Sequence, residues 1–416
     1  MTPDTSDWLI SVDDHVLEPA HLWQERVPAR FKERAPRLVR DDAGEAWLYD
    51  DKRMVTPGLG AVAGKTKEQF SFEPITYEEM RPGCYDSVAR LEDMDRAGVL
   101  ASLCFPSFPR FCGQVFYEAK DKDLALACVR AYNDWMIEEW CGRAPGRFIP
   151  LTLVPLWDPV LAAAEVYRAA GNGSKAIAFS ENPAGLGLPT IHAKDGHWDP
   201  LMAACQETGL VICMHIGSSS MRYTMSAESP MLVTMSWSPP LLIAGAMIEW
   251  LFSPVFKKFP GVKIALAEGG IGWIPFFLEK CAQVVDKHRY WIARGDVRHN
   301  QLTGLVEVDT TGAVELDDFS VVDTFRRHIY GCFIDDVHGV RNLDAIGVDN
   351  VMIETDYPHS DSTWPNCLEH ARKQLAGLSE EDRHKIMRGN AERLFRFTPA
   401  DAGSMGPGPG KPRGRT

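Results

Sequence analysis

The feature that most constrains the fold is a regular alternation between short apolar runs and longer amphipathic stretches. The apolar runs are rich in β-branched residues, Cys and Met, and they lack the polar alternation of a strand with one solvated face. Strands buried on both faces by crossover helices have this pattern. We therefore predict eight strands, at Trp8–Val12, Val99–Phe105, Phe148–Val154, Ala176–Phe179, Leu210–Met214, Val262–Ala267, His328–Phe333 and Asn350–Glu354.

Helical periodicity separates most of these runs. The predicted helices are Lys120–Cys141, Pro159–Ala170, Asp199–Thr208, Leu241–Phe256, Gly272–Ala293, Ser320–Arg327 and Val337–Ile346. Repeated β/α alternation favours a closed (β/α)₈ TIM barrel over an open doubly wound sheet. The chain has 416 residues, of which 45% are hydrophobic, and shows no repeat or interdomain linker. We expect one α/β barrel domain over residues 1–400.

Two segments do not fit the alternation. Residues 20–85 form too long a connection for a crossover and are rich in Pro, Gly and charge, so we expect an insertion after the first strand that caps the barrel mouth. Residues 38–54 alternate around Asp42-Ala43-Gly44 and predict a hairpin within it. Residues 401–416 are Gly/Pro-rich without apolar periodicity, which predicts a disordered tail.

Charge and composition exclude several partners. The formal net charge is −13, and Lys and Arg do not gather into a phosphate-binding face, so we expect no nucleic acid partner. The first residues lack a signal peptide's basic start and apolar run, and the apolar stretch Leu241–Phe252 is interrupted by Gly245 and Glu249. The ten cysteines stand singly, without a CxxC pair. These features predict a soluble cytoplasmic protein with reduced thiols and no membrane contact.

The residues that follow the predicted strands indicate chemistry. In a parallel barrel the active site forms where the strands end at their carboxyl side. Imidazoles and carboxylates stand at several of these ends: Asp13 and His15, His215, Glu268 and Asp356. Packed carboxylates repel one another unless a cation neutralises them, so the pattern predicts a site for a divalent metal.

Each of these positions also has a structural interpretation. Asp13 and His15 are two residues apart and share one face of an extended strand, with Asp14 facing away, yet they could form an ordinary exposed turn. His215 could be a hydrogen-bonded core histidine, Glu268 could cap the helix that begins near Gly272, and Asp356 could be a cap or turn residue. Independent coincidences at one edge of the barrel are less plausible than a shared site.

Four further residues are candidates at the same rim. Glu18 and His359 add metal donors, so that the site could hold one ion or two. Arg110 follows the second strand and could bind an anionic group of the substrate, although a structural salt bridge explains it equally well. Trp364 follows the eighth strand and is expected to line the pocket.

These motifs resemble a known family. Asp13-Asp14-His15, His215, Ala267-Glu268-Gly269-Gly270, Thr355–His359 and the closing Asn390–Phe395 look like the amidohydrolase-related (amidohydrolase 2) family, which contains aminocarboxymuconate semialdehyde decarboxylase and the resorcylate decarboxylases. The resemblance spans nearly the whole chain. It implies a metal-dependent TIM barrel, with zinc or manganese held by Asp13, His15, His215 and Asp356, and a homodimer.

One position departs from that family. The decarboxylases usually have an acid/base histidine after the sixth strand, whereas this chain has Glu268. Glu268 could act as the acid/base, together with Asp356, or bind a metal directly. The leading expectation is a hydrolase or carbon-carbon lyase acting on a small anionic substrate. The alternatives are a monooxygenase with two irons, favoured by the carboxylate-rich donor set, and a metal-dependent scaffold without catalysis.

Overall fold

All eight expected strands form in the computed structural model, which describes residue 5 and residues 7–292, 296–299, 303–304, 306–309, 316 and 318–400. The expected tail, residues 401–416, lies outside the described residues. The third strand is divided at Pro150, which cannot donate a ladder hydrogen bond. The barrel strands are β1 (Leu9–Val16), β5 (Val99–Pro106), β6 (Phe148–Ile149), β7 (Leu151–Leu153), β8 (Ala176–Ser180), β9 (Val211–His215), β10 (Ile264–Ala267), β13 (Ile329–Phe333) and β14 (Val351–Ile353).

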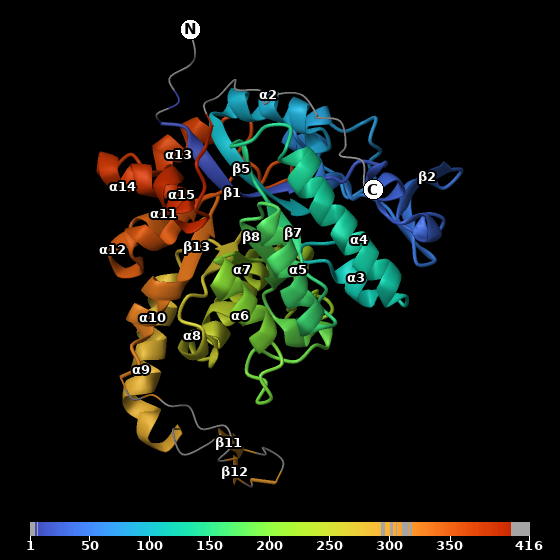
Figure 1. The fold of residues 1–416 in the computed structure, drawn as a ribbon. Coiled ribbons are helices and arrows are strands. Elements are labelled where there is room, and N and C mark those ends of the chain that lie inside the picture. The colour runs from blue at the N-terminus through green and yellow to red at the C-terminus, as the bar shows by residue number, and fades with distance from the viewer. Residues whose placement is uncertain are drawn as a thin grey trace.

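The strands close into a barrel. A three-stranded sheet has the order β1-β5-β6, a six-stranded sheet has the order β14-β13-β10-β9-β8-β7, and the chain itself joins them at Pro150. Backbone hydrogen bonds seal the remaining gap, from the His15 N–H to the Tyr357 oxygen at 2.7 Å and from the Asp356 N–H to the Asp13 oxygen at 2.9 Å. Every ladder between these strands is parallel. The predicted (β/α)₈ barrel is therefore confirmed (Figure 1).

Helices cover the outside of the barrel, and three of them begin after an aspartate whose side chain accepts two backbone N–H groups: Asp86, Asp121 and Asp158. The larger helices are α2 (Ser87–Ala97), α4 (Lys122–Trp135), α5 (Pro159–Gly171), α6 (Asp199–Thr208), α7 (Met231–Leu251), α9 (Ile274–Ile292), α10 (Val321–His328) and α13 (Cys367–Gln374). The shorter ones are α1 (Leu22–Arg26), α3 (Gln114–Glu118), α8 (Val255–Lys258), α11 (Val337–Val340), α12 (Leu343–Ile346), α14 (Glu380–His384) and α15 (Asn390–Leu394).

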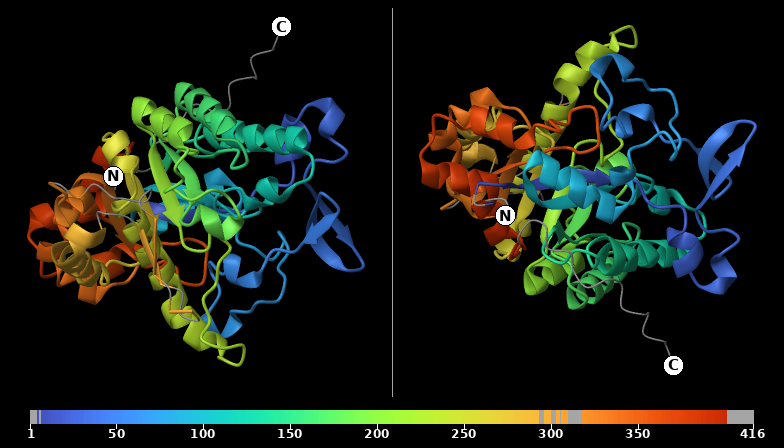
Figure 2. Two further views of the ribbon diagram at one scale, coloured as in Figure 1. Left: turned by 90° about the horizontal axis from the view of Figure 1, so that it is seen from below. Right: turned by 90° about the horizontal axis from the view of Figure 1, so that it is seen from above.

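Helix α7 begins ten residues before the expected start at Leu241, because it continues through Pro239 and Pro240. Its C-terminal half is buried against the barrel, whereas its N-terminal half is apolar but exposed, with Leu232 77% exposed. Figure 2 shows this half projecting from the barrel beside the middle of the insertion. By length and composition alone α7 could cross a membrane, with 39% of the apolar window buried. That is weak evidence, since core helices of soluble proteins pass the same test.

The insertion contains the predicted hairpin and one further strand. Strands β2 (Arg37–Asp41), β3 (Gly44–Tyr49) and β4 (Lys52–Met54) form an antiparallel sheet. The chain then returns to the barrel, where the Val62 N–H donates to the Pro358 oxygen at 2.9 Å, two residues after Asp356. A second small sheet, β11 (Asp296–His299) with β12 (Val306–Asp309), has no counterpart among the predicted strands.

Candidate active site and metal centre

Strand β1 supplies the first two side chains of the site. Asp13 and His15 are completely buried, and the His15 Nε2 lies 3.7 Å from the Asp13 Oδ1. Asp14 turns the other way, as expected from the two-residue period of a strand. Its carboxylate accepts hydrogen bonds from the hydroxyl of Thr355 at 2.5 Å, from the Tyr357 N–H at 2.9 Å and from the Ser102 hydroxyl.

His215 ends β9 with its ring turned into the barrel mouth. Its Nδ1 lies 2.6 Å from the Ile216 carbonyl oxygen, which accepts the proton of that nitrogen. Its Nε2 then faces Glu268 Oε2 at 3.0 Å and Asp13 Oδ2 at 3.4 Å. A histidine held by a carbonyl on one nitrogen and surrounded by carboxylates on the other has the arrangement of a metal ligand. His215 is therefore not simply a hydrogen-bonded histidine of the core, which was the alternative interpretation.

Glu268 and Asp356 share an unusual backbone. Both have positive φ, 58° and 52°, a conformation that is rare outside glycine and that clusters at functional sites. Gly269 must follow Glu268, because a Cβ there would lie 2.3 Å from a methyl carbon of Ile243 in α7. The helix-cap interpretation of Glu268 is wrong: Asp336 instead accepts the N–H groups of residues 271 and 272, at 2.7 and 2.6 Å.

His359 closes the site from the side of the insertion. Its ring stacks on that of His15, with centroids 3.6 Å apart and planes 16° from parallel. Its Nδ1 lies 3.2 Å from the Asp356 Oδ1, which is also 3.1 Å from the His15 Nε2. Burial alone would lower the pKa of His359, but the carboxylates of Asp356 and Glu268 outweigh it and raise that pKa.

The donor set fits a divalent cation. One ligand atom each of Asp13, His15, His215 and Glu268 lies within 4.8 Å of the others, and Asp356 adjoins them through His15. Among the described residues, no backbone N–H and no hydroxyl donates a hydrogen bond to either carboxylate oxygen of Asp13 or Asp356, although all four oxygens are buried. Burial, with repulsion from Glu354 and Glu268, raises the pKa of Asp13 well above its usual value. A bound cation would satisfy these oxygens and offset the repulsion.

Three candidate residues lie outside this cluster. Both oxygens of Glu18 accept backbone N–H groups, from Ser107 at 3.0 Å and Phe108 at 2.8 Å, so Glu18 does not join the metal donors. Arg110 has a positive φ of 60° and an exposed side chain that does not line the cavities described below. Trp364 packs away from the mouth, where its indole N–H donates to the Asp93 oxygen at 3.0 Å.

Three further residues lie at the site and were not among the candidates predicted from the sequence. Phe111, next to Arg110, stacks on His215 with centroids 4.0 Å apart, because the turn at Arg110 rotates the next side chain inward. Glu354 is buried behind the site and accepts the Glu268 N–H at 3.0 Å. Arg222 lines the cavity beside Glu268. Glu354 lies at the end of a predicted strand and could have been found there, whereas the loop around Arg222 carries no pattern.

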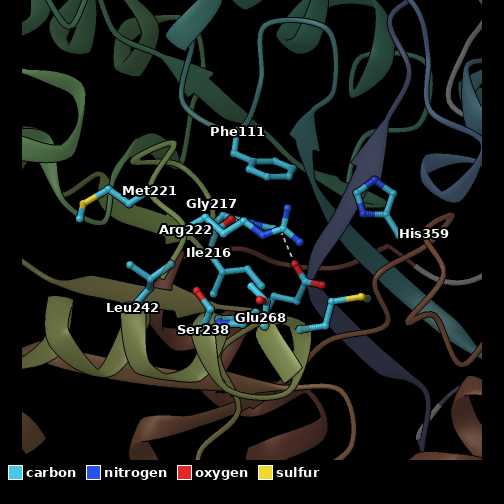
Figure 3. Close-up of a pocket in the computed structure, with 13 residues that line it drawn as sticks. Phe111, Ile216, Gly217, Met221, Arg222, Ser238, Leu242, Glu268 and His359 are labelled. Carbon is cyan, nitrogen blue, oxygen red and sulfur yellow. Dashed lines mark hydrogen bonds and ion pairs between the residues drawn. The ribbon is translucent and has the colours of Figure 1, made fainter. Parts of the chain in front are cut away.

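Two cavities meet at the cluster and share Phe111, Glu268 and His359. The first, the α7 lobe, has a volume of about 310 Å³, and Figure 3 shows its residues. The second, the insertion lobe, has a volume of about 290 Å³. Apart from the shared residues, the α7 lobe is lined chiefly by Ile216, Met221, Arg222, Met235, Pro239 and Leu242, and the insertion lobe by Leu17, Pro57, Leu59, Ser107, Ser360 and Asp361.

A (β/α)₈ barrel with a buried carboxylate and imidazole cluster at its carboxyl rim defines a class of metal-dependent barrel enzymes. The chain belongs to the amidohydrolase family, whose model matches residues 20–397. The resemblance drawn from the sequence motifs is thus confirmed.

Relatives agree with this assignment. The chain is 25% identical to a gamma-resorcylate decarboxylase of Rhodococcus jostii over 350 residues, 81% of this chain and 96% of the relative. Its fold is similar to an amidohydrolase of Mycobacterium avium subsp. paratuberculosis, with a TM-score of 0.68, 20% identity and coverage of 93% and 97%.

A 5-carboxyvanillate decarboxylase of Novosphingobium aromaticivorans, described as complexed with manganese and 4-hydroxy-3-methoxy-5-nitrobenzoic acid, has a TM-score of 0.63, 15% identity and coverage of 95% and 98%. A metal-dependent hydrolase or carboxy-lyase of the amidohydrolase type agrees with these relatives, and the monooxygenase with two irons finds no support in them.

Proposed function

We propose that this protein is a metal-dependent decarboxylase that removes CO₂ from an aromatic carboxylic acid. The curated relatives are decarboxylases of a hydroxylated aromatic acid, and two structural relatives were solved with manganese. The observation that carries the proposal is the position of Glu268, which contacts the metal donor His215 and borders both cavities. A substrate on the cluster would therefore lie against a carboxyl group that can transfer a proton.

Asp13, His15, His215 and Asp356 would hold the metal, for which the relatives favour manganese. When bound, a divalent ion supplies positive charge that polarises substrate oxygens. The protein keeps these four side chains dehydrated, since all are at most 1% exposed. A dry site strengthens every charge interaction in it.

Glu268 would act as the acid. The bond between the ring carbon and the carboxylate breaks, the electron pair stays on the ring carbon, and CO₂ leaves. The ring carbon then takes a proton from the carboxyl group of Glu268, which regains one from solvent. The Glu268 side chain is 13% exposed, unlike the fully buried Asp13 and Asp356, so it has the required access to water.

Arg222, whose side chain is exposed, would attract the anionic substrate as it enters the site. It lines the α7 lobe, and Figure 3 shows it extending across that lobe. A guanidinium matches a carboxylate in shape and charge. This assigns to Arg222 the role that the sequence analysis considered for Arg110.

The test uses protein loaded with manganese and a set of ortho-hydroxybenzoates, with CO₂ release as the measurement. In D₂O, one deuterium should appear at the carbon that lost the carboxylate. Glu268→Gln should lower the rate at least about a hundredfold, because it removes the transferable proton. Glu279→Gln, an exposed glutamate on α9, is the matched control. No CO₂ from any acid, or an unchanged rate in Glu268→Gln, would refute the proposal.

The metal content of Glu268→Gln separates its two possible roles. Retained manganese with a lost rate favours the acid role, whereas a halved metal content favours Glu268 as the ligand of a second ion. The homodimer and the cytoplasmic location stay predictions, and light scattering of the purified protein would test the first.

A further inference from the structure

The cavity around the cluster is larger than a single aromatic ring requires. An apolar protein cavity of about 150 Å³ holds benzene. The α7 lobe and the insertion lobe measure about 310 Å³ and 290 Å³, so each exceeds that size on its own. They lie on two sides of Phe111, Glu268 and His359, which line both. A one-ring acid placed beside Glu268 would leave most of one lobe to water.

The two lobes differ in chemistry. The α7 lobe is walled mainly by Ile216, Met235 and Leu242 and by further Met and Pro side chains; Arg222, whose side chain is exposed, carries a positive charge at this lobe, and Glu268 is the one carboxylate in its lining. The insertion lobe combines apolar side chains with the hydroxyls of Ser107 and Ser360 and three carboxylates. Water against the apolar wall is unfavourable, so the part of the α7 lobe formed by Ile216, Met235 and Leu242 favours an apolar group.

The residues around each lobe agree with an apolar group in the α7 lobe and the reacting ring toward the insertion lobe. Gly60 brings the insertion against the cluster, since a Cβ there would lie 3.9 Å from the His359 Nε2. The α7 lobe opens to solvent at its rim, where Met235 is 51% exposed. The side that admits a longer group is therefore the α7 side.

We infer that the substrate is an extended aromatic acid, whose reacting ring lies beside Glu268 toward the insertion lobe and whose apolar arm, the size of a second ring, fills the α7 lobe. The inference rests on the proposed function for the identity of the reacting group. The arm itself follows from the size and lining of the α7 lobe.

The test measures binding without turnover, by calorimetry on protein loaded with manganese. The probes are ortho-nitrophenol and its derivative with a phenyl ring para to the nitro group. The nitro group replaces the carboxylate, so neither probe can lose CO₂. The phenyl derivative should bind at least about tenfold more tightly, because its second ring leaves water.

Filling the α7 lobe should remove this gain. In Leu242→Trp the phenyl derivative should lose its advantage to within about threefold, while ortho-nitrophenol keeps its parental affinity. Met235→Trp fills the same lobe from its exposed rim and replaces the first variant if Leu242→Trp fails to fold. Leu59→Trp, in the insertion lobe, is the matched control and should weaken both probes together, which leaves their ratio unchanged.

The outcomes separate this inference from the proposed function. Equal affinities for the two probes, or a gain that survives both tryptophan variants of the α7 lobe, would overturn the inference even if ortho-hydroxybenzoates lose CO₂. A tenfold gain that Leu242→Trp removes would support it even if none of those acids reacts.

Discussion

Two groups of carboxylates stand at the ends of the barrel strands, all of them buried except the half-buried Asp336, and they differ in what surrounds their oxygens. In the first, the oxygens of Asp13 and Asp356 face imidazoles and other carboxylates, and no backbone N–H or hydroxyl in the part of the chain that the structure describes donates to them. In the second, Asp14 and Asp336 are surrounded by donors. Asp336 alone accepts three backbone N–H groups, from residues 271, 272 and 339, at 2.6 to 2.7 Å.

The difference shows which carboxylates need a partner from outside the chain. A buried carboxylate is costly unless hydrogen bonds or a cation compensate it. Asp14 and Asp336 obtain hydrogen bonds within the fold, which offset part of that cost, although burial still raises the pKa of Asp14. Asp13 and Asp356 do not, so they are arranged to receive a cation. Adjacent residues of one strand, Asp13 and Asp14, thus belong to opposite groups.

Asp13→Asn should have the largest effect on activity. It removes a charged oxygen donor, so manganese should be lost and the rate should fall by more than the roughly hundredfold typical of residues that merely support metal ligands. Since burial raises the pKa of Asp13, the neutral asparagine should leave the metal-free protein as stable as the parent or more so. Elemental analysis and thermal unfolding measure the two effects. Full metal content at the parental rate would contradict the assignment of Asp13.

Asp14→Asn should have the opposite result. The carboxylate accepts hydrogen bonds from the hydroxyls of Ser11, Ser102 and Thr355 and from the Tyr357 N–H, and an amide cannot accept all of these bonds, so unfolding should become easier by about 1–3 kcal/mol. The protein that remains folded should bind manganese in the parental ratio. A loss of metal without a loss of stability would place Asp14 in the same group as Asp13.

Glu354→Gln should produce a smaller effect, confined to the rate. Glu354 holds the backbone of Glu268 at its positive φ, through the Glu268 N–H at 3.0 Å, and glutamine keeps one acceptor oxygen. We expect kcat to fall about tenfold, with KM and metal content within twofold of the parent. A residue with only a structural role would lower the unfolding temperature and leave kcat unchanged, which is the outcome that would refute a positioning role.

The strand pattern predicted the barrel because parallel strands buried on both faces have few sequence alternatives. It also predicted where Asp13, His15, His215 and Glu268 would meet, since the carboxyl ends of all barrel strands share one rim. A residue's position along the strand could not show whether its carboxylate binds a metal or accepts hydrogen bonds from the protein. Glu18 was expected among the donors, yet two backbone N–H groups of the β5 loop hold it.

The residues that shape the cavity could not be predicted from the sequence, because their positions depend on the conformation of the backbone at a few sites. The backbone at Arg110 adopts a positive φ, which exchanges the expected arginine for Phe111 at the site. Helix α7 continues through Pro239 and Pro240, at which a helix normally ends, and its N-terminal half forms a wall of the α7 lobe. Loop conformation and a tolerated proline pair depend on tertiary contacts that periodicity does not contain.

Glu18 is intermediate between the two groups of carboxylates. Its carboxylate accepts hydrogen bonds, but from only two backbone N–H groups, those of Ser107 and Phe108. Burial raises its pKa to about 7, and the N–H groups of Phe108 and Ser107 offset only part of that rise. The folded protein therefore binds this proton more readily than the unfolded chain, whose glutamate has an ordinary pKa. The stability from the proton is complete below that ordinary pKa and is lost as the pH rises through about 7.

Glu18→Gln removes this titration while it keeps the side chain neutral. The stability of the variant relative to the parent should therefore rise between about pH 4.5 and pH 7, by up to about 3 kcal/mol, and level off above. Urea unfolding of both proteins across this range measures the difference, in which the titration of all other groups cancels. A difference that does not change with pH would mean that two backbone N–H groups suffice to keep a buried carboxylate charged. Glu18 would then stand with Asp14 and Asp336 as a carboxylate held by hydrogen bonds within the fold.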